Sequence, residues 1–429
     1  MSRSLIDFHQ IPSHPLSFDP RTMTTPLESS LPGRLRILMI ATKPAHPPVD
    51  GGRLLMWNTI KELAAQGHRV TFVSPDLDLG KNGAERNLLK YCAAVHLIPA
   101  RTRSFGPSLI RAFSANLPSS IVRHSHSAVS ERVAEIVAER NHDVIHAEQI
   151  HSLANLPDAP ILPPVVLRAQ NVESQLWRMV ARIKPRLAWF ARREARQMAA
   201  FEAESLDRVA CTIALTGHDG AILGGALGMT ARRIRIIPPP FPSTLGHTGR
   251  PLEGDPAIVL VAGGWLPNVD STNWFFSSIW REIRGNLPLA RVHVFGEHAP
   301  RAEPGVTSHL SPADSSEIFG TGAILVVPLR VASGIRMKIL EAWSRKVPVV
   351  ATPEATRGLH GSDGREFLLA NDGREFTAAI RRLSRDKDLR NVIVENGVSA
   401  LMTHYQPASV AALLEKTYIE AMARETGFI

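Results

Sequence analysis

The residues best suited to hold a diphosphate surround a turn and a helix in the C-terminal half of the chain. Ser333 precedes a helix that we predict over 334–345, and this helix carries Arg336 and Lys338 in its first turn. A helix N-terminus presents free backbone N–H groups and a partial positive charge, and we expect Ser333 to be the N-cap. The two cations would neutralise the charge that grows on a leaving phosphate as a glycosidic bond breaks.

Glu341 lies two turns further along the same predicted helix. Its side chain leans back toward the helix N-terminus, so its carboxylate could accept hydrogen bonds from both hydroxyls of a ribose. A glutamate on an ordinary exposed helix has the same spacing, and the spacing alone favours that plainer interpretation.

A second turn with the right chemistry, Asp50-Gly51-Gly52-Arg53, follows the first apolar segment and opens a helix. Glycine has no Cβ, so a phosphate could approach the backbone closely at this helix N-terminus. A Gly-Gly pair also occurs simply as a turn, and the sequence leaves both interpretations open. The segment is not a Walker loop, because the Gly-Lys-Ser/Thr ending is absent.

Polar candidates also lie near the ends of two predicted strands. His146 ends the DVIH segment, and His151 and Glu148 close by are alternative candidates. A lone histidine at a strand end more often packs or hydrogen-bonds than reacts, and the spacing of these residues does not predict zinc. Asn171 and Glu173 follow the next strand and could face a cleft, although Asn171 serves equally as a plain N-cap, which we favour.

Parallel strands must position these residues, because a ligand of an open α/β sheet lies beyond the carboxyl ends of the strands. Short apolar runs predict strands in two series separated by a Pro-rich break, and helical periodicity fills the gaps, including helices over 185–207 and 271–283 and three closing helices. The predicted strands are 35–41, 69–74, 94–99, 143–146, 164–168, 210–215 and 235–237 before the break, and 257–262, 290–295, 323–328 and 348–351 after it.

The length of 429 residues also favours two domains, since a single core stops growing at about 250–300 residues. We expect an α/β protein with two facing Rossmann-like domains and a cleft between them. The predicted parts are a flexible extension at 1–33, an N-terminal domain at 34–240, a linker at 241–256, a C-terminal domain at 257–404 and a helix at 405–429 that packs back on the N-terminal domain.

Composition bounds the location and the partners. Two cysteines, Cys92 and Cys211, have no disulfide or metal spacing, and no signal peptide or run of about 18 apolar residues is present. We therefore expect a cytoplasmic protein. The net charge of +9 comes partly from clusters of arginine near 182–196. These could contact the inner face of an anionic membrane or a phosphorylated carrier, or form solvated helix faces, which is the plainer interpretation; no nucleic-acid module is visible.

The stretch GIRMKILEAWSRKVPVVATPEATRGL resembles the signature of the large retaining glycosyltransferase family four, and DGGRL together with DVIHAE resembles its N-terminal half. The resemblance covers roughly residues 34–425. It implies a GT-B fold with an acceptor-binding N-terminal domain and a nucleotide-sugar-binding C-terminal domain. It also implies transfer of a sugar from a UDP-type or GDP-type donor with retention of anomeric configuration.

The resemblance assigns roles to the candidates above and adds others. Catalytic roles fall to His146, Arg336 and Lys338, and the ribose falls to Glu341. The donor diphosphate would lie against Gly51, Gly52, Gly263, Gly264, Ser333, Gly334 and Ile335. His309 and Leu310 would flank the nucleobase, and Asn171 and Glu173 would face the acceptor or the cleft.

Two departures from the family pattern bear on the donor. Ser333 stands where the family usually has a glutamate that holds sugar hydroxyls, and the loop Gly263-Gly-Trp-Leu-Pro-Asn-Val-Asp270 lacks the usual Arg and Lys. This loop resembles a subgroup of bacterial exopolysaccharide-type sugar transferases better. In that case Arg336 and Lys338 supply the missing cations.

The expected reaction needs no cofactor and no metal ion, since the resemblance implies that the leaving phosphate itself helps to deprotonate the acceptor. The acceptor stays open between a lipid-linked saccharide, a natural product and a protein, since its pocket would come from variable segments near 100–130 and 174–190. A sugar-nucleotide epimerase of GT-B fold and a non-catalytic nucleotide-sugar-binding subunit are the alternatives.

Overall fold

The computed structural model describes residues 33–77, 83–100, 105–158, 161–225, 233–246, 250–296, 303–312 and 315–425. The predicted extension at 1–33 lies almost wholly outside the described residues, as do 247–249 of the predicted linker and the last residues of the predicted C-terminal helix. From Arg34 onward the chain forms one compact unit.

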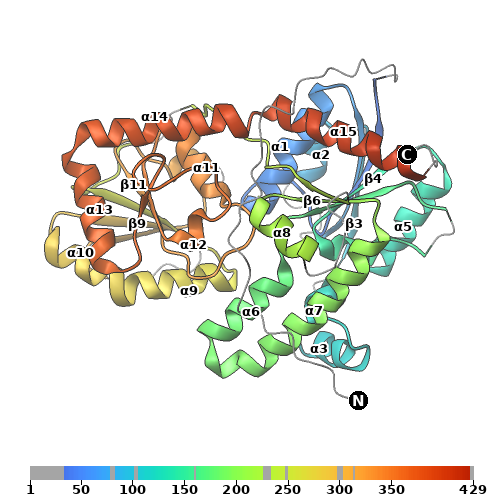
Figure 1. Ribbon diagram of the computed structural model, residues 1–429, viewed down its shortest axis with the longest axis horizontal. Helices are drawn as coiled ribbons and strands as arrows, with labels where there is room; N and C mark the ends of the chain where they lie inside the picture. The colour runs from blue at the N-terminus through green and yellow to red at the C-terminus, as the bar shows by residue number, and fades with distance from the viewer. Residues whose placement is uncertain are drawn as a thin grey trace. The chain divides into compact units, whose positions relative to one another are not determined.

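The N-terminal part is built on a seven-stranded parallel sheet in the order β3-β2-β1-β4-β5-β6-β7 (Figure 1). Its central strands are buried on both faces, which is why they appear in the sequence as continuous apolar runs. The strands are β1 Arg36–Ile40, β2 Arg69–Asp76, β3 Ala94–Pro99, β4 Val144–Glu148, β5 Val165–Ala169, β6 Cys211–Ala214 and β7 Ile234–Ile236.

Helices cover both faces of this sheet. Apolar residues of α1, α2 and the last helix of the chain form the core on one face, and those of α4, α5, α7 and α8 form the core on the other. The helices are α1 Gly51–Ala65, α2 Ala84–Leu88, α3 Phe105–Ser114, α4 Ser119–His124, α5 Ser127–Ala138, α6 Glu173–Ile183, α7 Ala188–Arg208 and α8 Gly217–Gly225.

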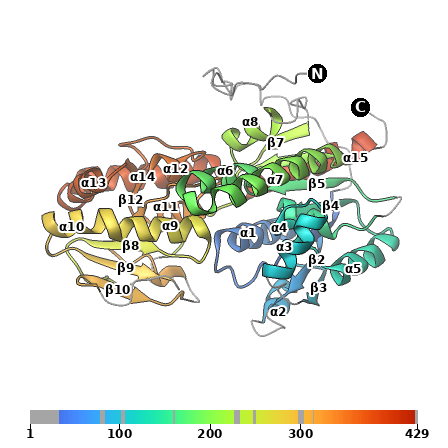
Figure 2. The same ribbon diagram turned by 90° about the horizontal axis from the view of Figure 1, so that it is seen from below.

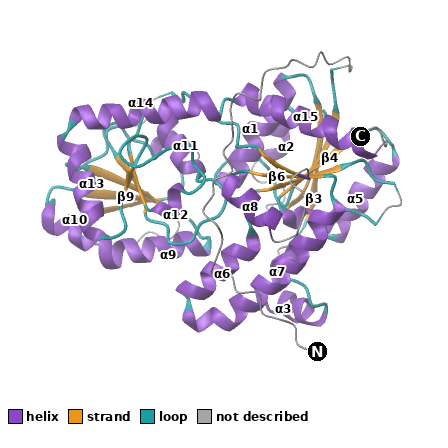
Figure 3. Cartoon of the chain, in the orientation of Figure 1, coloured by secondary structure: helices purple, strands orange, loops and turns teal. Residues whose placement is uncertain are grey.

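The C-terminal part repeats this design with a six-stranded parallel sheet in the order β10-β9-β8-β11-β12-β13 (Figure 2). Its strands are β8 Ala257–Val261, β9 Arg291–Phe295, β10 Val306–His309, β11 Ile324–Val327, β12 Val349–Ala351 and β13 Leu368–Leu369. Its helices are α9 Leu266–Trp274, α10 Trp280–Asn286, α11 Met337–Ser344, α12 Pro353–Thr356, α13 Gly373–Arg385 and α14 Lys387–His404, followed by α15 Pro407–Glu425. The predicted α/β class with two parallel sheets is thus confirmed (Figure 3).

Several predicted elements were wrong in detail. The strands β10 and β13 were missed, because β10 is a partly exposed edge strand with the mixed sequence VTSH and β13 has only two residues. The helix predicted to begin at residue 271 begins at Leu266, with Pro267 in its first turn, and passes through a π-helical turn at Phe275–Ile279.

The first residues of the predicted linker are packed against the C-terminal part of the chain. The Phe241 side chain is buried, its backbone N–H donates to the carbonyl of Tyr405 at 2.8 Å, and Ser344 donates to the carbonyl of Pro242 at 2.8 Å. Residues just after Pro240 are therefore tied to α11 and to the junction of α14 with α15.

The final helix α15 packs against the N-terminal sheet through polar as well as apolar contacts. Inside the core, the Tyr418 hydroxyl lies 2.7 Å from Nδ1 of His146 on β4. Nearer the surface, Arg235 contacts Glu420 at 2.5 Å, and Gln66 donates to the carbonyl of Ala408 at 3.0 Å. The end of the chain thereby stabilises the sheet formed by its beginning.

Replacing Tyr418 by Phe should lower the free energy of unfolding by about 1–3 kcal/mol, because Nδ1 of buried His146 loses its partner. Chemical denaturation measures the free energy of unfolding of this variant and of a control, Tyr91→Phe. Tyr91 is a suitable control because it is partly exposed and no hydrogen bond of its hydroxyl is described. Equal stability of the two variants would show that the Tyr418 hydroxyl does not hold α15 in place.

Candidate active site

The N-termini of α1, from the N-terminal part, and α11, from the C-terminal part, lie next to each other. A Cβ built on Gly51, the first residue of α1, would lie 3.2 Å from Cγ of Met337, the first residue of α11. The first backbone N–H groups of a helix have no acceptor within the helix. The positive ends of two helix dipoles therefore converge, which is the electrostatic setting that a diphosphate requires.

Close packing explains the two glycines at the start of α1. A Cβ on Gly52 would lie 2.8 Å from Oε1 of Gln170, and Gly51 faces Met337 as described above. Asp50 is the N-cap, accepts from the Arg53 backbone N–H at 3.0 Å and pairs with Lys43 at 2.8 Å. Burial would raise the pKa of Asp50, but Lys43 and Arg53 lower it, so that the carboxylate stays charged.

The two cations at the start of α11 have no acidic side chain within ion-pair distance among the described residues. Arg336 donates to the carbonyl of Ser333, and its Nε is buried without a partner. Lys338 donates to the carbonyl of Val261 at 3.2 Å. Burial lowers the pKa of Arg336 to about 10, with Asp219 opposing, and burial together with Arg336 lowers the pKa of Lys338 to about 8.

Glu341 lies about one turn from the start of α11 and is buried. Its Oε1 accepts from the Ser315 hydroxyl and from Nε of Arg345 at 3.1 Å. These contacts fix the orientation of the carboxylate, while no described residue donates to its Oε2. The arrangement leaves one carboxylate oxygen that can accept from a ligand hydroxyl.

Ser333 is not the N-cap of α11, contrary to the prediction. The helix begins at Met337, and the Ser333 hydroxyl instead donates to Oδ1 of Asp219 at 3.0 Å and accepts from the backbone N–H of Val172 at 2.8 Å. Gly334 donates to Oδ2 of Asp219 at 3.0 Å. Long-range bonds to the N-terminal part thus replace the local cap, and the predicted 334–345 helix loses its first turn.

Gly334 lies in tight contact with the loop after β5. Its φ is +69°, a left-handed conformation that favours glycine, and a Cβ there would lie 2.1 Å from the carbonyl oxygen of Gln170 and 2.9 Å from Oδ1 of Asn171. Ile335, the next residue, is buried. Only a residue without a side chain allows this approach.

Asn171 is not an N-cap either, because α6 begins after Val172, which has no side-chain cap. Its amide donates to Oε1 of Glu173 at 3.1 Å. Burial raises the pKa of Glu173, and burial with the nearby Glu173 raises the pKa of Glu202 on α7 to about 7. The structure therefore places Asn171 and Glu173 beside Gly334, at the edge of the candidate site.

His146 lies beneath the candidate site and is fully buried. Its Nε2 is 3.2 Å from Glu148, its Nδ1 is bonded to Tyr418, and Glu148 forms an ion pair with Arg168 on β5. Burial would raise the pKa of Glu148, but Arg168 and His146 lower it to about 2. Both ring nitrogens of His146 are thus engaged within the protein.

The remaining predicted residues lie on two loops of the C-terminal part. Gly263 and the exposed Gly264 follow β8, directly after the carbonyl that Lys338 contacts. His309 ends β10, stacks on Phe295 with ring centroids 4.3 Å apart, and is followed by the exposed Leu310. No described contact links His309 or Leu310 to α11.

Three polar residues beside the candidate site were not predicted from the sequence. Gln149 bridges the sheet edge by accepting from Thr42 at 2.8 Å and donating to Gln170 at 2.8 Å, and Gln170 donates to Glu148 at 2.8 Å. Asp219 is the third. Gln149 has a φ of +67°, but neither this strain nor contacts over so many residues leave a local signal in the sequence.

Within the described ranges, no three His, Cys, Asp or Glu side chains gather as a metal site would require. The alternative candidate His151 lies against His124, with ring centroids 4.8 Å apart, and burial lowers its pKa to about 4. Of the helices that the structure describes, none is long and apolar enough to cross a membrane.

Two family models match the chain in succession. The model described as Glycosyltransferase Family 4 matches residues 49–244, and the model described as Glycosyl transferases group 1 matches residues 256–386. Together they span more than half of the chain. No curated protein sequence matches it closely enough to count as a relative.

Solved structures resemble the whole chain in fold. HepE from Anabaena in complex with UDP-glucose is 12% identical, with 89% of this chain and 99% of that chain covered and a TM-score of 0.59. Sucrose-phosphate synthase from Thermosynechococcus elongatus is 15% identical, with 91% and 100% covered and a TM-score of 0.65. WaaG, a glycosyltransferase involved in lipopolysaccharide biosynthesis, is 16% identical, with 88% and 99% covered and a TM-score of 0.60. At these identities the likeness establishes the GT-B fold.

Replacing Gly334 by Ala should weaken the binding of uridine or guanosine diphosphate by at least about tenfold, because the new Cβ would push the loop of Gln170 away from α11. Gly322→Ala is a matched control, since Gly322 has a φ of +86° but no atom within 4 Å of its Cβ position. Titration calorimetry measures both. If the two variants bind alike, backbone strain rather than the contact at Gly334 determines affinity.

Proposed function

We propose, from the premise that the chain is a glycosyltransferase of the family 4 type with the GT-B fold, that it transfers a sugar from a UDP-type or GDP-type donor to an acceptor with retention of anomeric configuration. The observation that carries the proposal is the meeting of two helix N-termini beside Arg336 and Lys338, two cations without an acidic partner among the described residues. A diphosphate supplies the negative charge that this arrangement lacks.

The geometry suggests how the donor diphosphate is held. Backbone amides of Gly51 and Gly52 approach it from the N-terminal part, and the start of α11 with Lys338 approaches it from the C-terminal part. Negative charge grows on the leaving phosphate as the bond to the sugar breaks, so preorganised amides and cations stabilise the transition state more than the ground state. That phosphate then accepts the proton of the attacking hydroxyl on the same face of the sugar, and retention follows.

The nucleoside end of the donor extends along α11. Glu341 is held by Arg345 and Ser315 with one oxygen left to accept from the ribose hydroxyls. His309 and Leu310 would flank the base, Leu310 being exposed at the end of an edge strand. A neighbour in fold was solved with UDP-glucose, which favours the UDP type for this chain.

His146 acts as a positioning residue in this proposal. It contacts Glu148, which accepts from Gln170, and the Oε1 of Gln170 lies against Gly52 at the start of α1. Its effect on the donor therefore passes through the buried network. Asn171 and Glu173, at the edge of the site beside Gly334, are placed to meet the acceptor.

The proposed reaction uses no cofactor and no metal ion. The work of neutralising the diphosphate falls to the helix amides and to Arg336 and Lys338. Activity with a nucleotide sugar that disappears on addition of a chelator and returns with a divalent cation would contradict this part of the proposal.

Replacing Arg336 or Lys338 singly by Ala should lower turnover by a factor of about 10², because each side chain balances charge that develops in the transition state. Lys346→Ala, which removes an exposed lysine from the same part of the chain, should leave turnover unchanged. Mass spectrometry of the glycoside formed from a panel of nucleotide sugars and candidate acceptors measures the rates. Full turnover in both Arg336→Ala and Lys338→Ala would remove the proposed site.

Affinity for the nucleotide diphosphate should fall as the pH rises from 7 to 9, by about tenfold. Lys338 has a pKa of about 8 and holds the anion only as the ammonium form, so deprotonation above pH 8 removes the charge, whereas the diphosphate is already ionised at pH 7. The variant Lys338→Arg keeps its charge throughout this range and should bind with nearly constant affinity. Parallel pH profiles of the two proteins would show that Lys338 does not contact the phosphates.

A further inference from the structure

One face of the N-terminal part combines exposed apolar side chains with arginines for which the described residues supply no acidic partner. It is formed by α3, by α7 and by the turn that precedes α7, and α3 lies beside α7 in Figure 1. Arg193 of α7 joins the two segments: it donates to the carbonyl of Ala112 at 2.9 Å, and its guanidinium lies 3.9 Å from the ring centroid of Phe113. We call this the α3–α7 face.

Large apolar side chains of the α3–α7 face point to solvent. Ile110 is 74% exposed, Trp189 66%, Phe113 49% and Leu187 47%. Single exposed apolar residues are normal on a protein surface, but four within α3 and the start of α7, two segments that Arg193 joins, favour a partner. Trp189 in addition has the amphipathic ring that is enriched where a membrane meets water.

The charge of the same face has one sign. Residues 178–197 contain seven basic residues and a single acid, Glu194, which is buried against Arg193. Lys184 forms an ion pair with Asp270 of α9 at 3.1 Å. The other five are exposed arginines for which no acidic partner is described: Arg178, Arg182, Arg186, Arg192 and Arg196.

We infer that the α3–α7 face docks on the surface of an anionic lipid bilayer. Apolar side chains would enter the boundary between headgroups and acyl chains, while the arginine heads pair with lipid phosphates, which is how interfacial helices bind membranes. A nucleic acid would satisfy the charges but would leave Ile110 and Trp189 in water. An acidic protein would need an apolar patch matched to this one, whereas the surface of an anionic bilayer supplies both the negative charge and the apolar medium. The inference concerns binding and does not depend on the proposed transfer reaction.

The docking surface has a consequence for the acceptor. Residues 105–124 and 173–190, which form α3, α4, α6 and the start of α7, coincide with the variable segments expected to shape the acceptor pocket. Glu173 begins α6 beside the candidate site, and the exposed turn follows the end of the same helix. Docking by this face would present a lipid-linked acceptor to the edge of that site.

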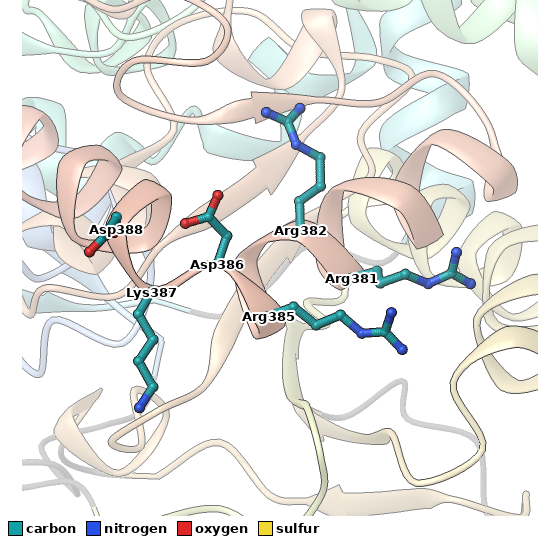
Figure 4. A pocket seen from close by; sticks show the side chains of 6 residues that line it. All are labelled: Arg381, Arg382, Arg385, Asp386, Lys387 and Asp388. Atoms are coloured by element: carbon teal, nitrogen blue, oxygen red, sulfur yellow. The ribbon is translucent and has the colours of Figure 1, made fainter.

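A second basic cluster provides a matched control. A hollow at the junction of α13 and α14 is lined by Arg381, Arg382, Arg385, Asp386, Lys387 and Asp388 (Figure 4). This hollow has three arginines, so the same number of charges can be removed here as on the α3–α7 face. Two acids lie among these arginines, and the lining includes no large apolar side chain.

Sedimentation with phosphatidylcholine vesicles, with and without phosphatidylglycerol, tests the inference on the full chain. The protein should bind the anionic vesicles and not the neutral ones, and binding should weaken as salt is raised. A triple change of Arg182, Arg186 and Arg192 to Gln should weaken binding by about 100-fold, at about fivefold for each arginine. Changing Arg381, Arg382 and Arg385 to Gln should have little effect.

The apolar contribution is tested separately by Trp189→Ala combined with Ile110→Ala, which should weaken vesicle binding but leave binding to heparin unchanged. Thermal unfolding and uridine diphosphate binding show whether each variant is folded. Equal losses for the two arginine triples, or vesicle binding that is indifferent to Trp189 and Ile110, would overturn the inference in favour of non-specific attraction to polyanions. Absence of binding to anionic vesicles would overturn it outright.

Discussion

The rest of the site depends on two cations at the start of α11, Arg336 and Lys338, which form no ion pair with the described residues of the protein. Arg336 and Lys338 begin a helix whose dipole adds to their field. Burial lowers the pKa of both, and no described carboxylate lies within ion-pair distance of either. Holding cations in this way costs stability. A fold that maintains them gains if an anionic ligand completes the site, so the charge favours the anionic donor that we propose.

A buried ion pair keeps the opposite wall in place. Glu148 ends β4, and Arg168 lies opposite it on the parallel strand β5. Hydrogen bonds from His146 and Gln170 to Glu148, and from Arg168 to Thr59, complete the ion pair, so that neither charge is left alone inside the sheet. The network fixes Gln170, whose carbonyl lies against Gly334 and whose side chain lies against Gly52. Gly52 and Gly334, on opposite sides of the site, therefore both pack on Gln170. The position of Gln170 sets the distance between the two glycines.

The sequence predicted those parts of the molecule that local rules control. Strands such as 35–41 are apolar runs because both faces of a parallel sheet are covered, and Gly51 and Gly52 were recognised at a helix start. The start of α11 was misplaced because Ser333 bonds Asp219, which lies 114 residues away in the chain. No capping rule contains such a contact. The engagement of both nitrogens of His146 was invisible for the same reason, since Tyr418 is 272 residues distant.

The pairing of Ser333 with Asp219 gives the most informative departure from the family pattern a physical reason. The Asp219 carboxylate accepts from the Ser333 hydroxyl and the Gly334 amide, and both residues are buried. A glutamate at position 333 would bring a second carboxylate against the first, and one of the two would have to take up a proton or leave. The Ser333 hydroxyl instead donates a hydrogen bond to the Asp219 carboxylate and brings no second negative charge. Serine at 333 and aspartate at 219 are therefore mutually consistent, and the acid that holds this turn comes from α8, on the opposite side of the site.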